Sequence, residues 1–184
     1  MAVKSIMIVG VGGQGTLLAS RLLGSALIDS GYEVKVSEIH GMSQRGGSVV
    51  TYVKYGDEVF SPTIEQGEAD IILAFEKLEA ARWLSFLKPD GKLVVNDQCI
   101  DPMPVITGAA EYPQNISEAI KAAGASMIEL DALSLAVKAG SAKAVKGSQC
   151  CSHRRHGKPY AIKLRDLDKR HKEHSARKVP RYEP

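Results

Sequence analysis

The sequence predicts an α/β fold: a doubly wound, mostly parallel sheet with helices on both faces and an inserted hairpin. Two observations lead to this prediction. An apolar run over residues 3–9 ends in the glycine-rich turn "GVGGQG" and is followed by a helical pattern and a second strand-like run. Further strand-like and helix-like runs then alternate up to residue 145.

The first unit reads strand, turn, helix, strand. The uninterrupted apolar run 3–9 is typical of a buried parallel strand, and residues 32–38 form the second strand. Between them we expect a helix from Gln14 to the stop at Gly31. Its pattern rests on side chains spaced three and four apart, namely Leu17, Leu18, Arg21, Leu22, Ser25 and Ala26.

The next segment, 46–62, alternates strictly and favours a hairpin that turns at Gly56-Asp57. Val49, Thr51, Val53 and Tyr55 would share one face, opposite Ser48, Val50, Tyr52 and Lys54. Asp131 is the expected N-cap of the last helix. The remaining pattern predicts strands at 69–76, 92–97 and 125–130, a turn at 88–91, and helices at 77–87, 115–124 and 131–145.

Charge and composition divide the chain into a domain over 1–145 and a tail over 146–184. Lys and Arg number 12 in residues 1–145 against 17 Asp and Glu, a net charge of −5, whereas the tail has 12 against 4, a net of +8. Only four Ile, Leu, Val, Met or Phe occur in the 39 tail residues, too few to bury a face. We expect the tail to be disordered or loosely attached.

No apolar run approaches the roughly 20 residues that span a bilayer, and the glycines from Gly10 onward interrupt the first apolar run too early for a signal peptide. We therefore expect a cytoplasmic protein without a membrane association. Three cysteines, Cys99, Cys150 and Cys151, are too few for an iron–sulfur cluster, which usually takes four thiolates. We expect no metal site on this chain.

The glycine turn has the pattern G-x-G-x-x-G between a strand and a helix, which permits close approach of an anion to the helix N-terminus. Glu38, at the end of the second strand, stands where a dinucleotide-binding fold places its acidic residue. The turn could therefore bind a nucleotide, and a free-standing NAD-dependent dehydrogenase is one alternative function. The other possible role of the turn is packing or an interface. The candidate residues here are Gly10, Gly12, Gly13, Gln14 and Gly15.

A second compliant stretch follows the second strand. Its polar side chains Glu38, His40, Ser43, Gln44 and Arg45 stand among Gly41, Gly46 and Gly47. Arg45 can grip a carboxylate or phosphate with two hydrogen bonds, and His40 can exchange a proton near neutral pH. Since both stretches follow strands of a doubly wound sheet, we expect them to be neighbours at its carboxyl edge. No nucleophile–base pair can be assembled, so we assign no catalytic residue and favour recognition.

Three stretches, "IVGVGGQGTLLASRLLG", "VSEIHGMSQRGGSVVTYVKYGDEVFSP" and "GSAKAV", resemble the small gamma-type subunit or domain of the 2-oxoacid:ferredoxin oxidoreductases, most closely the indolepyruvate branch. The resemblance covers residues 1–145. It implies that the complex converts a 2-oxoacid, coenzyme A and oxidised ferredoxin into acyl-CoA, carbon dioxide and reduced ferredoxin. In this branch the substrates are aryl pyruvates.

The resemblance also implies a partner: a larger catalytic subunit, forming a heterodimer, that carries thiamine diphosphate, Mg and 4Fe–4S clusters and passes electrons to ferredoxin. This chain lacks the cysteines for clusters and a "GDG…N" diphosphate segment, so we expect an accessory subunit that is inactive alone. The two glycine-containing stretches would lie at the subunit interface. There, Arg45 and the amides of the turn would meet the 2-oxoacid carboxylate or coenzyme A.

The tail departs from this family, whose members usually continue into an apolar helix after "GSAKAV". The abrupt change near residue 146 indicates a shift of reading frame. If the tail is native, Cys150, Cys151, His153 and His156 offer a zinc site of unusual spacing. Its basic residues offer a nucleic-acid surface, although no aromatic interleaving or known motif supports it. We rank both below the accessory-subunit hypothesis.

Overall fold

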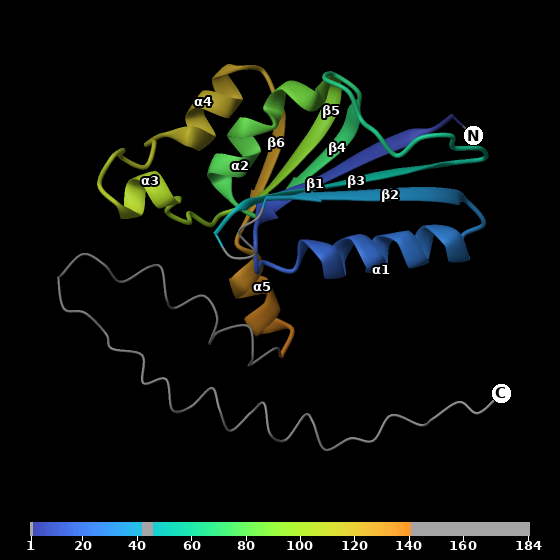
Figure 1. Cartoon of the computed structure of the whole chain (residues 1–184), viewed down its shortest axis with the longest axis horizontal. Coiled ribbons are helices and arrows are strands. Elements are labelled where there is room, and N and C mark those ends of the chain that lie inside the picture. The colour runs from blue at the N-terminus through green and yellow to red at the C-terminus, as the bar shows by residue number, and fades with distance from the viewer. Residues whose placement is uncertain (1, 42–45, 141–184) are drawn as a thin grey trace. The chain divides into compact units, whose positions relative to one another are not determined.

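Six strands form one mixed sheet in the computed structural model of the chain, which describes residues 2–41 and 46–140 (Figure 1). The predicted tail and its boundary at residue 146 lie outside these residues. The strand order is β2-β3-β1-β4-β5-β6. The strands are β1 (Lys4–Val11), β2 (Glu33–His40), β3 (Ser48–Gly56), β4 (Ala69–Ala74), β5 (Leu87–Asn96) and β6 (Ser126–Leu130).

The sheet is mostly parallel, as predicted. β1, β4, β5 and β6 pair in parallel, and β3 alone runs antiparallel to both of its neighbours, β1 and β2. β2 therefore runs in the direction of β1 but is separated from it by β3. The inserted hairpin occupies one side of β1, and the parallel strands occupy the other.

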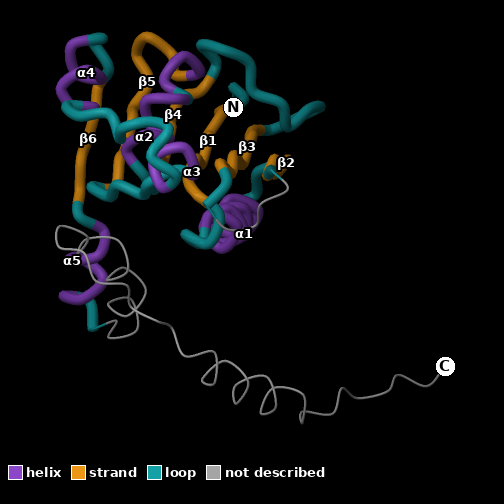
Figure 2. Tube along the Cα trace, turned by 60° about the vertical axis from the view of Figure 1, so that its left-hand side comes forward, coloured by secondary structure: helices purple, strands orange, loops and turns teal. Residues whose placement is uncertain are grey.

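Helices lie on both faces of the sheet, which confirms the predicted α/β class. α1 covers one face, whereas α2 and α4 lie on the other (Figures 1 and 2). Among the described residues, no helix is long and apolar enough to cross a membrane. The helices are α1 (Thr16–Asp29), α2 (Lys77–Arg82), the 3-10 helix η1 (Leu84–Phe86), α3 (Met103–Ile106), α4 (Ile116–Ala122) and α5 (Ala132–Lys138).

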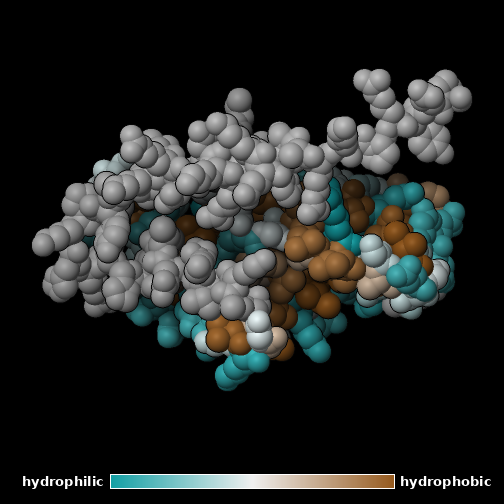
Figure 3. Space-filling view, turned by 90° about the horizontal axis from the view of Figure 1, so that it is seen from below, coloured by the Kyte–Doolittle hydropathy of each residue, from teal (hydrophilic) through white to brown (hydrophobic). Residues whose placement is uncertain are grey.

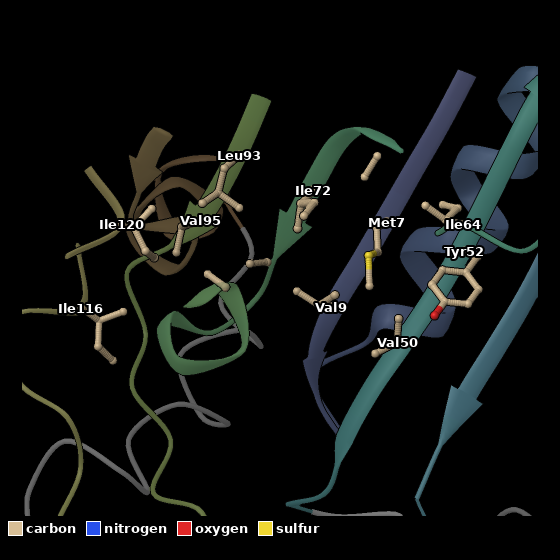
Figure 4. Close-up of a cluster of buried hydrophobic side chains, with 13 residues drawn as sticks. Met7, Val9, Val50, Tyr52, Ile64, Ile72, Leu93, Val95, Ile116 and Ile120 are labelled. Atoms are coloured by element: carbon tan, nitrogen blue, oxygen red, sulfur yellow. The ribbon is translucent and has the colours of Figure 1, made fainter. Parts of the chain in front are cut away.

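The apolar core has a layer on each side of β1, whose residues from Ser5 to Val11 are all buried. Met7 and Val9 point toward the α2 and α4 side, where they join Ile72 and Leu93 of the neighbouring strands (Figure 4). Ile6 and Ile8 point to the other face, where Val53 joins them and α1 packs on top with its Leu23 and Leu27. β1 is thus the buried centre of the sheet.

α1 packs on the sheet with small buried residues and with Leu23 and Leu27, not with the leucines whose spacing predicted it. Thr16, Ser20 and Gly24 are buried against the sheet, whereas Leu18 and Leu22 are 63% and 64% exposed. Figure 3, seen from the side of α1, shows hydrophobic residues on this face of the molecule. The helix was predicted correctly, but the direction of its larger side chains was not.

The predicted hairpin within 46–62, with its turn at Gly56-Asp57, is wrong; β3 forms a hairpin with β2 instead. β3 ends at Gly56, and residues 57–68 form no strand. The partner of β3 is β2, with His40 opposite Val49 and Glu33 opposite Gly56. The alternation within β3 was read correctly, since Val50 and Tyr52 join one core layer and Val53 the other. The tight-turn signal misled because the hairpin connection lies before β3, not after it.

The predicted turn at 88–91 is also wrong, because these residues belong to β5. The pairing with β4 is irregular here, shifting between Ala69 opposite Leu87 and Ile71 opposite Lys92. The helix predicted over 77–87 is α2, which is shorter and ends at Arg82. By contrast, Asp131 is the predicted N-cap of α5, where its carboxylate accepts a hydrogen bond from the Ser134 amide at 3.0 Å.

Candidate functional site

The two glycine-containing stretches meet at one edge of the sheet. β1 and β2 both end there, with Gly10, Val49 and His40 aligned in one row across three strands. The Gly12 amide donates a hydrogen bond to the Gly47 carbonyl at 2.8 Å. The predicted neighbourhood is therefore present, although β3 lies between the two parallel strands.

The glycine turn adopts a backbone conformation that residues other than glycine rarely adopt. Gly13 and Gly15 have φ angles of 98° and 90°, and Gly15 is the N-cap of α1. No side chain caps this 14-residue helix, and its first turn holds no acidic residue. Its first amides and the positive end of its dipole thus face the edge of the sheet, where they suit an anionic group.

Gln14, predicted to contact a ligand or partner, has its carboxamide engaged inside the fold. Its Oε1 accepts from the Val11 amide at 2.7 Å. Its Nε2 donates to the Phe75 carbonyl at 2.9 Å and to Gln98 Oε1 at 3.1 Å. A Cβ on Gly10 would lie 2.9 Å from Gln14 Oε1, so Gly10 makes room for this contact. These two residues shape the turn from within.

A pocket of about 440 Å³ lies beside the turn. One wall comes from the turn and the start of α1, and the other comes from the ends of β2 and β3. Its lining residues are Gly12, Gly13, Gly15, Thr16, Leu17, Glu38, His40 and Val49. Five of the predicted site residues therefore share one cavity.

Glu38 and His40 are both exposed. His40 Nδ1 lies 3.2 Å from the carbonyl of Gly41. One row behind the pocket, Thr51 pairs with Glu38 and Ile8. Its buried hydroxyl has no hydrogen-bond partner among the residues that the structure describes. The pocket thus combines backbone amides on one wall with a carboxylate and an imidazole on the other.

The remaining predicted residues divide into two groups. Gly41 and Gly46 are exposed and Gly47 is half-buried; Gly46 has a φ of 78°. Ser43, Gln44 and Arg45 lie outside the described residues, so their part in the site stays a prediction.

A buried carboxylate on α2 reaches the same edge from the opposite face of the sheet, and no sequence pattern indicated it. Glu79 is 4% exposed and accepts from the Ser48 hydroxyl at 2.5 Å and from Trp83 Nε1 at 3.3 Å. Arg82 Nε lies 3.4 Å from its other oxygen. In the sequence, Glu79 cannot be told from a solvent-exposed acid of a short helix. Its contact with Ser48 is visible only in the fold.

Glu76 is a second buried acid in this region, at 1% exposure. It caps α2 by accepting from the Glu79 amide at 2.9 Å, and it also accepts from the Ile100 amide and the Tyr112 hydroxyl. Partial burial, the Glu76 carboxylate and the nearby Cys99 thiol raise the pKa of Tyr112 well above its ordinary value. Tyr112 and Cys99 line a separate pocket of about 460 Å³.

Within residues 2–41 and 46–140, no three His, Cys, Asp or Glu side chains are grouped in a way that could hold a metal ion. Cys99 is a free, exposed cysteine. The alternative zinc ligands Cys150, Cys151, His153 and His156 fall outside the described part of the chain. The described residues of the pocket offer backbone amides, a carboxylate and an imidazole.

Comparison with known proteins gives matches across the whole site. The family of pyruvate ferredoxin/flavodoxin oxidoreductases matches residues 5–148. The chain is 44% identical over 139 residues to the indolepyruvate oxidoreductase subunit IorB of Pyrococcus horikoshii, covering 74% of this chain and 69% of that protein.

Two solved structures share the fold. The pyruvate oxidoreductase subunit PORC of Thermotoga maritima has a TM-score of 0.51 at 19% identity, covering 75% of this chain and 67% of that one. The gamma subunit of a keto/oxoacid ferredoxin oxidoreductase from Geobacter sulfurreducens has a TM-score of 0.50 at 22% identity, covering 77% and 69%. At these identities the likeness concerns the fold alone.

Proposed function

Because this chain belongs to the pyruvate ferredoxin/flavodoxin oxidoreductase family, we propose that it is the beta subunit of an indolepyruvate ferredoxin oxidoreductase. It acts as an accessory subunit in that complex. The observation that carries the proposal is the 44% identity to an indolepyruvate oxidoreductase subunit over 139 residues.

In the proposed reaction, the bond between the carboxylate and the carbonyl carbon of an aryl pyruvate breaks and releases carbon dioxide. The acyl group forms a thioester with the sulfur of coenzyme A, whose thiol proton is released. The two electrons set free reduce two ferredoxins by one electron each. The products are acyl-CoA, carbon dioxide and reduced ferredoxin.

The cofactors of this reaction are proposed for the larger subunit. A 4Fe–4S cluster usually needs four thiolates, and the whole sequence has three cysteines. Thiamine diphosphate with its Mg would supply carbanion stabilisation on that partner. This chain's own contribution is binding and orientation, in keeping with a pocket that offers amides, Glu38 and His40.

We assign the pocket beside the glycine turn to the interface with the larger subunit, near the entrance to its active site. The uncapped N-terminus of α1 suits an anion. The reaction has two anionic candidates, the 2-oxoacid carboxylate and the phosphates of coenzyme A. The exposed position of Glu38 and His40 leaves them accessible to a partner chain.

The test is reconstitution with a larger subunit of an indolepyruvate ferredoxin oxidoreductase. We expect the two chains to copurify, and indolepyruvate- and coenzyme A-dependent reduction of ferredoxin or a viologen dye to require both. A larger subunit that is fully active without this chain would contradict the proposal. So would the absence of any association between the two.

A further inference from the structure

We propose that Glu79 is a positioning residue that holds the Gly47–Ser48 step of the chain against the glycine turn, and so keeps the pocket wall in place. Glu79 belongs to α2, on the face of the sheet opposite α1, and lines no part of the pocket. Its effect on the site would therefore pass through other residues. This role deepens the function proposed above and rests on it only for its consequence in the complex.

The first step is the burial of the Glu79 carboxylate. A buried charge is unfavourable unless donors surround it. Three do so here: Ser48 Oγ at 2.5 Å, Trp83 Nε1 at 3.3 Å and Arg82 Nε at 3.4 Å. Arg82 and Trp83 lie only three and four residues after Glu79 in the chain, so Ser48, 31 residues away, is the long-range partner of the three.

The second step is the place of Ser48 beside the pocket. Ser48 is the first residue of β3 and pairs with Val11, the last residue of β1. The preceding residue, Gly47, accepts the hydrogen bond from the Gly12 amide at 2.8 Å. The following residue, Val49, lines the pocket. Fixing Ser48 therefore fixes both the contact with the glycine turn and one wall of the pocket.

The third step is the glycine composition of the segment that precedes Ser48. Gly46 and Gly47 have no side chains with which to anchor themselves, and Gly46 has a φ of 78°. Glycine loses more backbone freedom on ordering than any other residue. A charge-assisted hydrogen bond from the next residue offsets part of that loss. Glu79 supplies the acceptor of that hydrogen bond.

Amide hydrogen exchange on the full chain tests the positioning directly, without a partner. Ser48→Ala removes the hydroxyl and leaves Glu79 in place. We expect the protection of the Gly12 amide to fall by about tenfold, equivalent to about 1.4 kcal/mol. The amide of Phe75, which donates to the Val9 carbonyl in the core at 2.9 Å, reports the general loss of stability. Glu79→Gln, which keeps the size but loses the charge, should act in the same direction.

The structure offers a matched control. Ser117 also donates to a glutamate, Glu129, at 3.0 Å, but lies on α4 and outside the pocket beside the glycine turn. Ser117→Ala removes the same kind of bond and should leave Gly12 as protected as before. Ser48→Thr keeps a hydroxyl on a residue type that suits a strand, and should restore the protection. If Gly12 and Phe75 lose protection in parallel in Ser48→Ala, the positioning role is wrong.

Kinetics of the reconstituted complex separate this role from the proposed function. If both are right, Ser48→Ala raises the KM for coenzyme A or the 2-oxoacid several-fold and leaves kcat nearly unchanged, and Ser48→Thr reverses the effect. If Gly12 loses protection but KM does not change, the positioning stands and the assignment of the pocket to the reaction fails.

Discussion

The side chain of Gln14 occupies the space that a Cβ on Gly10 would need, because that atom would lie 2.9 Å from Gln14 Oε1. Phe75 Cβ and Thr16 Cγ2 would each be 3.1 Å away, so the added atom would be too close to three side chains at once. The glycine at position 10 is therefore a packing requirement of the turn. The first glycine of the G-x-G-x-x-G pattern is therefore explained by its packing against Gln14 and needs no bound nucleotide.

Gly10→Ala should destabilise the chain by about 1–3 kcal/mol, the range for inserting atoms into a packed region. Gly24→Ala is the matched control. The new Cβ would meet Val36 at an ordinary 3.9 Å, and alanine favours the helix. That variant should be unchanged or up to about 1 kcal/mol more stable. Urea unfolding measures both, and equal destabilisation of the two would contradict the close packing at Gly10.

Leu17→Asp places a negative charge in the first turn of α1, at a pocket residue that is 43% exposed. The charge favours the helix by roughly 0.3–1 kcal/mol, but it repels an anion at the same place. We expect a higher KM for coenzyme A or the 2-oxoacid in the complex without loss of folding. Leu22→Asp, on the same helix outside the pocket, is the control for losing an exposed leucine. A KM that rises equally in both variants would not support an anion at this end of α1.

Arg45→Ala tests the residue that the sequence singled out for gripping a carboxylate or phosphate. Loss of a two-point contact to an anion should raise the KM for coenzyme A or the 2-oxoacid by about tenfold or more. Steady-state kinetics of the reconstituted complex measure it, and Arg45→Lys separates charge from the two-point geometry. Unchanged kinetics with unchanged assembly would remove Arg45 from the site.

Tyr112 should keep its phenol proton beyond the ordinary tyrosine range. Partial burial, the Glu76 carboxylate and the Cys99 thiol all raise its pKa. Since the folded pKa lies above the unfolded value of about 10, the contribution to stability is present below pH 10 and is lost as the pH rises beyond it. In a titration followed at 295 nm, Tyr112→Phe should remove a component that ionises late or only on unfolding. If Tyr112→Phe instead loses a component that ionises in the ordinary tyrosine range, near pH 10, this prediction is contradicted.

Asp70 should contribute to acid sensitivity. Partial burial opposes its ionisation, but Lys88 at 2.9 Å, the Ser5 amide at 2.9 Å and Lys4 at 3.1 Å together lower its pKa. The stabilisation is therefore present above the unfolded pKa of about 3.9 and is lost as the pH falls through the lower folded value. Asp70→Asn should cost about 1 kcal/mol at pH 7, with the difference from wild type shrinking below about pH 4. Urea unfolding from pH 2 to 7 measures it; a constant difference would contradict the linkage.

Local signals predicted the strand β1, the turn, α1 and the N-cap Asp131, because each depends on residues close together in the chain. The internal role of Gln14 was not predictable, since its partners Phe75 and Gln98 lie 61 and 84 residues away. The face of α1 that packs on the sheet also escaped prediction. Thr16, Ser20 and Gly24 are buried, and Leu23 and Leu27 pack on the core. The leucines whose spacing predicted the helix, Leu17, Leu18 and Leu22, are exposed.

The neighbourhood of the candidate residues was predicted, but the contacts that support it were not. Gly12, Gly13, Gly15, Glu38 and His40 line one pocket, as their positions after two strands indicated. Glu79 and Ser48 were absent from that prediction, because their contact crosses from α2 to β3 and leaves no periodic pattern. The hairpin turn was misplaced for a related reason: Gly56-Asp57 resembles a tight turn locally, while pairing across strands decided the partner of β3.

The central position of β1 has a consequence for the order in which the chain can fold during synthesis. β1 is synthesised before either of its neighbours in the sheet, β3 and β4. Its backbone groups thus wait for residues up to Ala74 before both edges are paired. The β2–β3 hairpin, by contrast, needs only residues adjacent in the chain. Until β4 has been synthesised, one edge of the buried strand β1 is therefore unpaired, and protection of that edge should fall to chaperones or to rapid elongation.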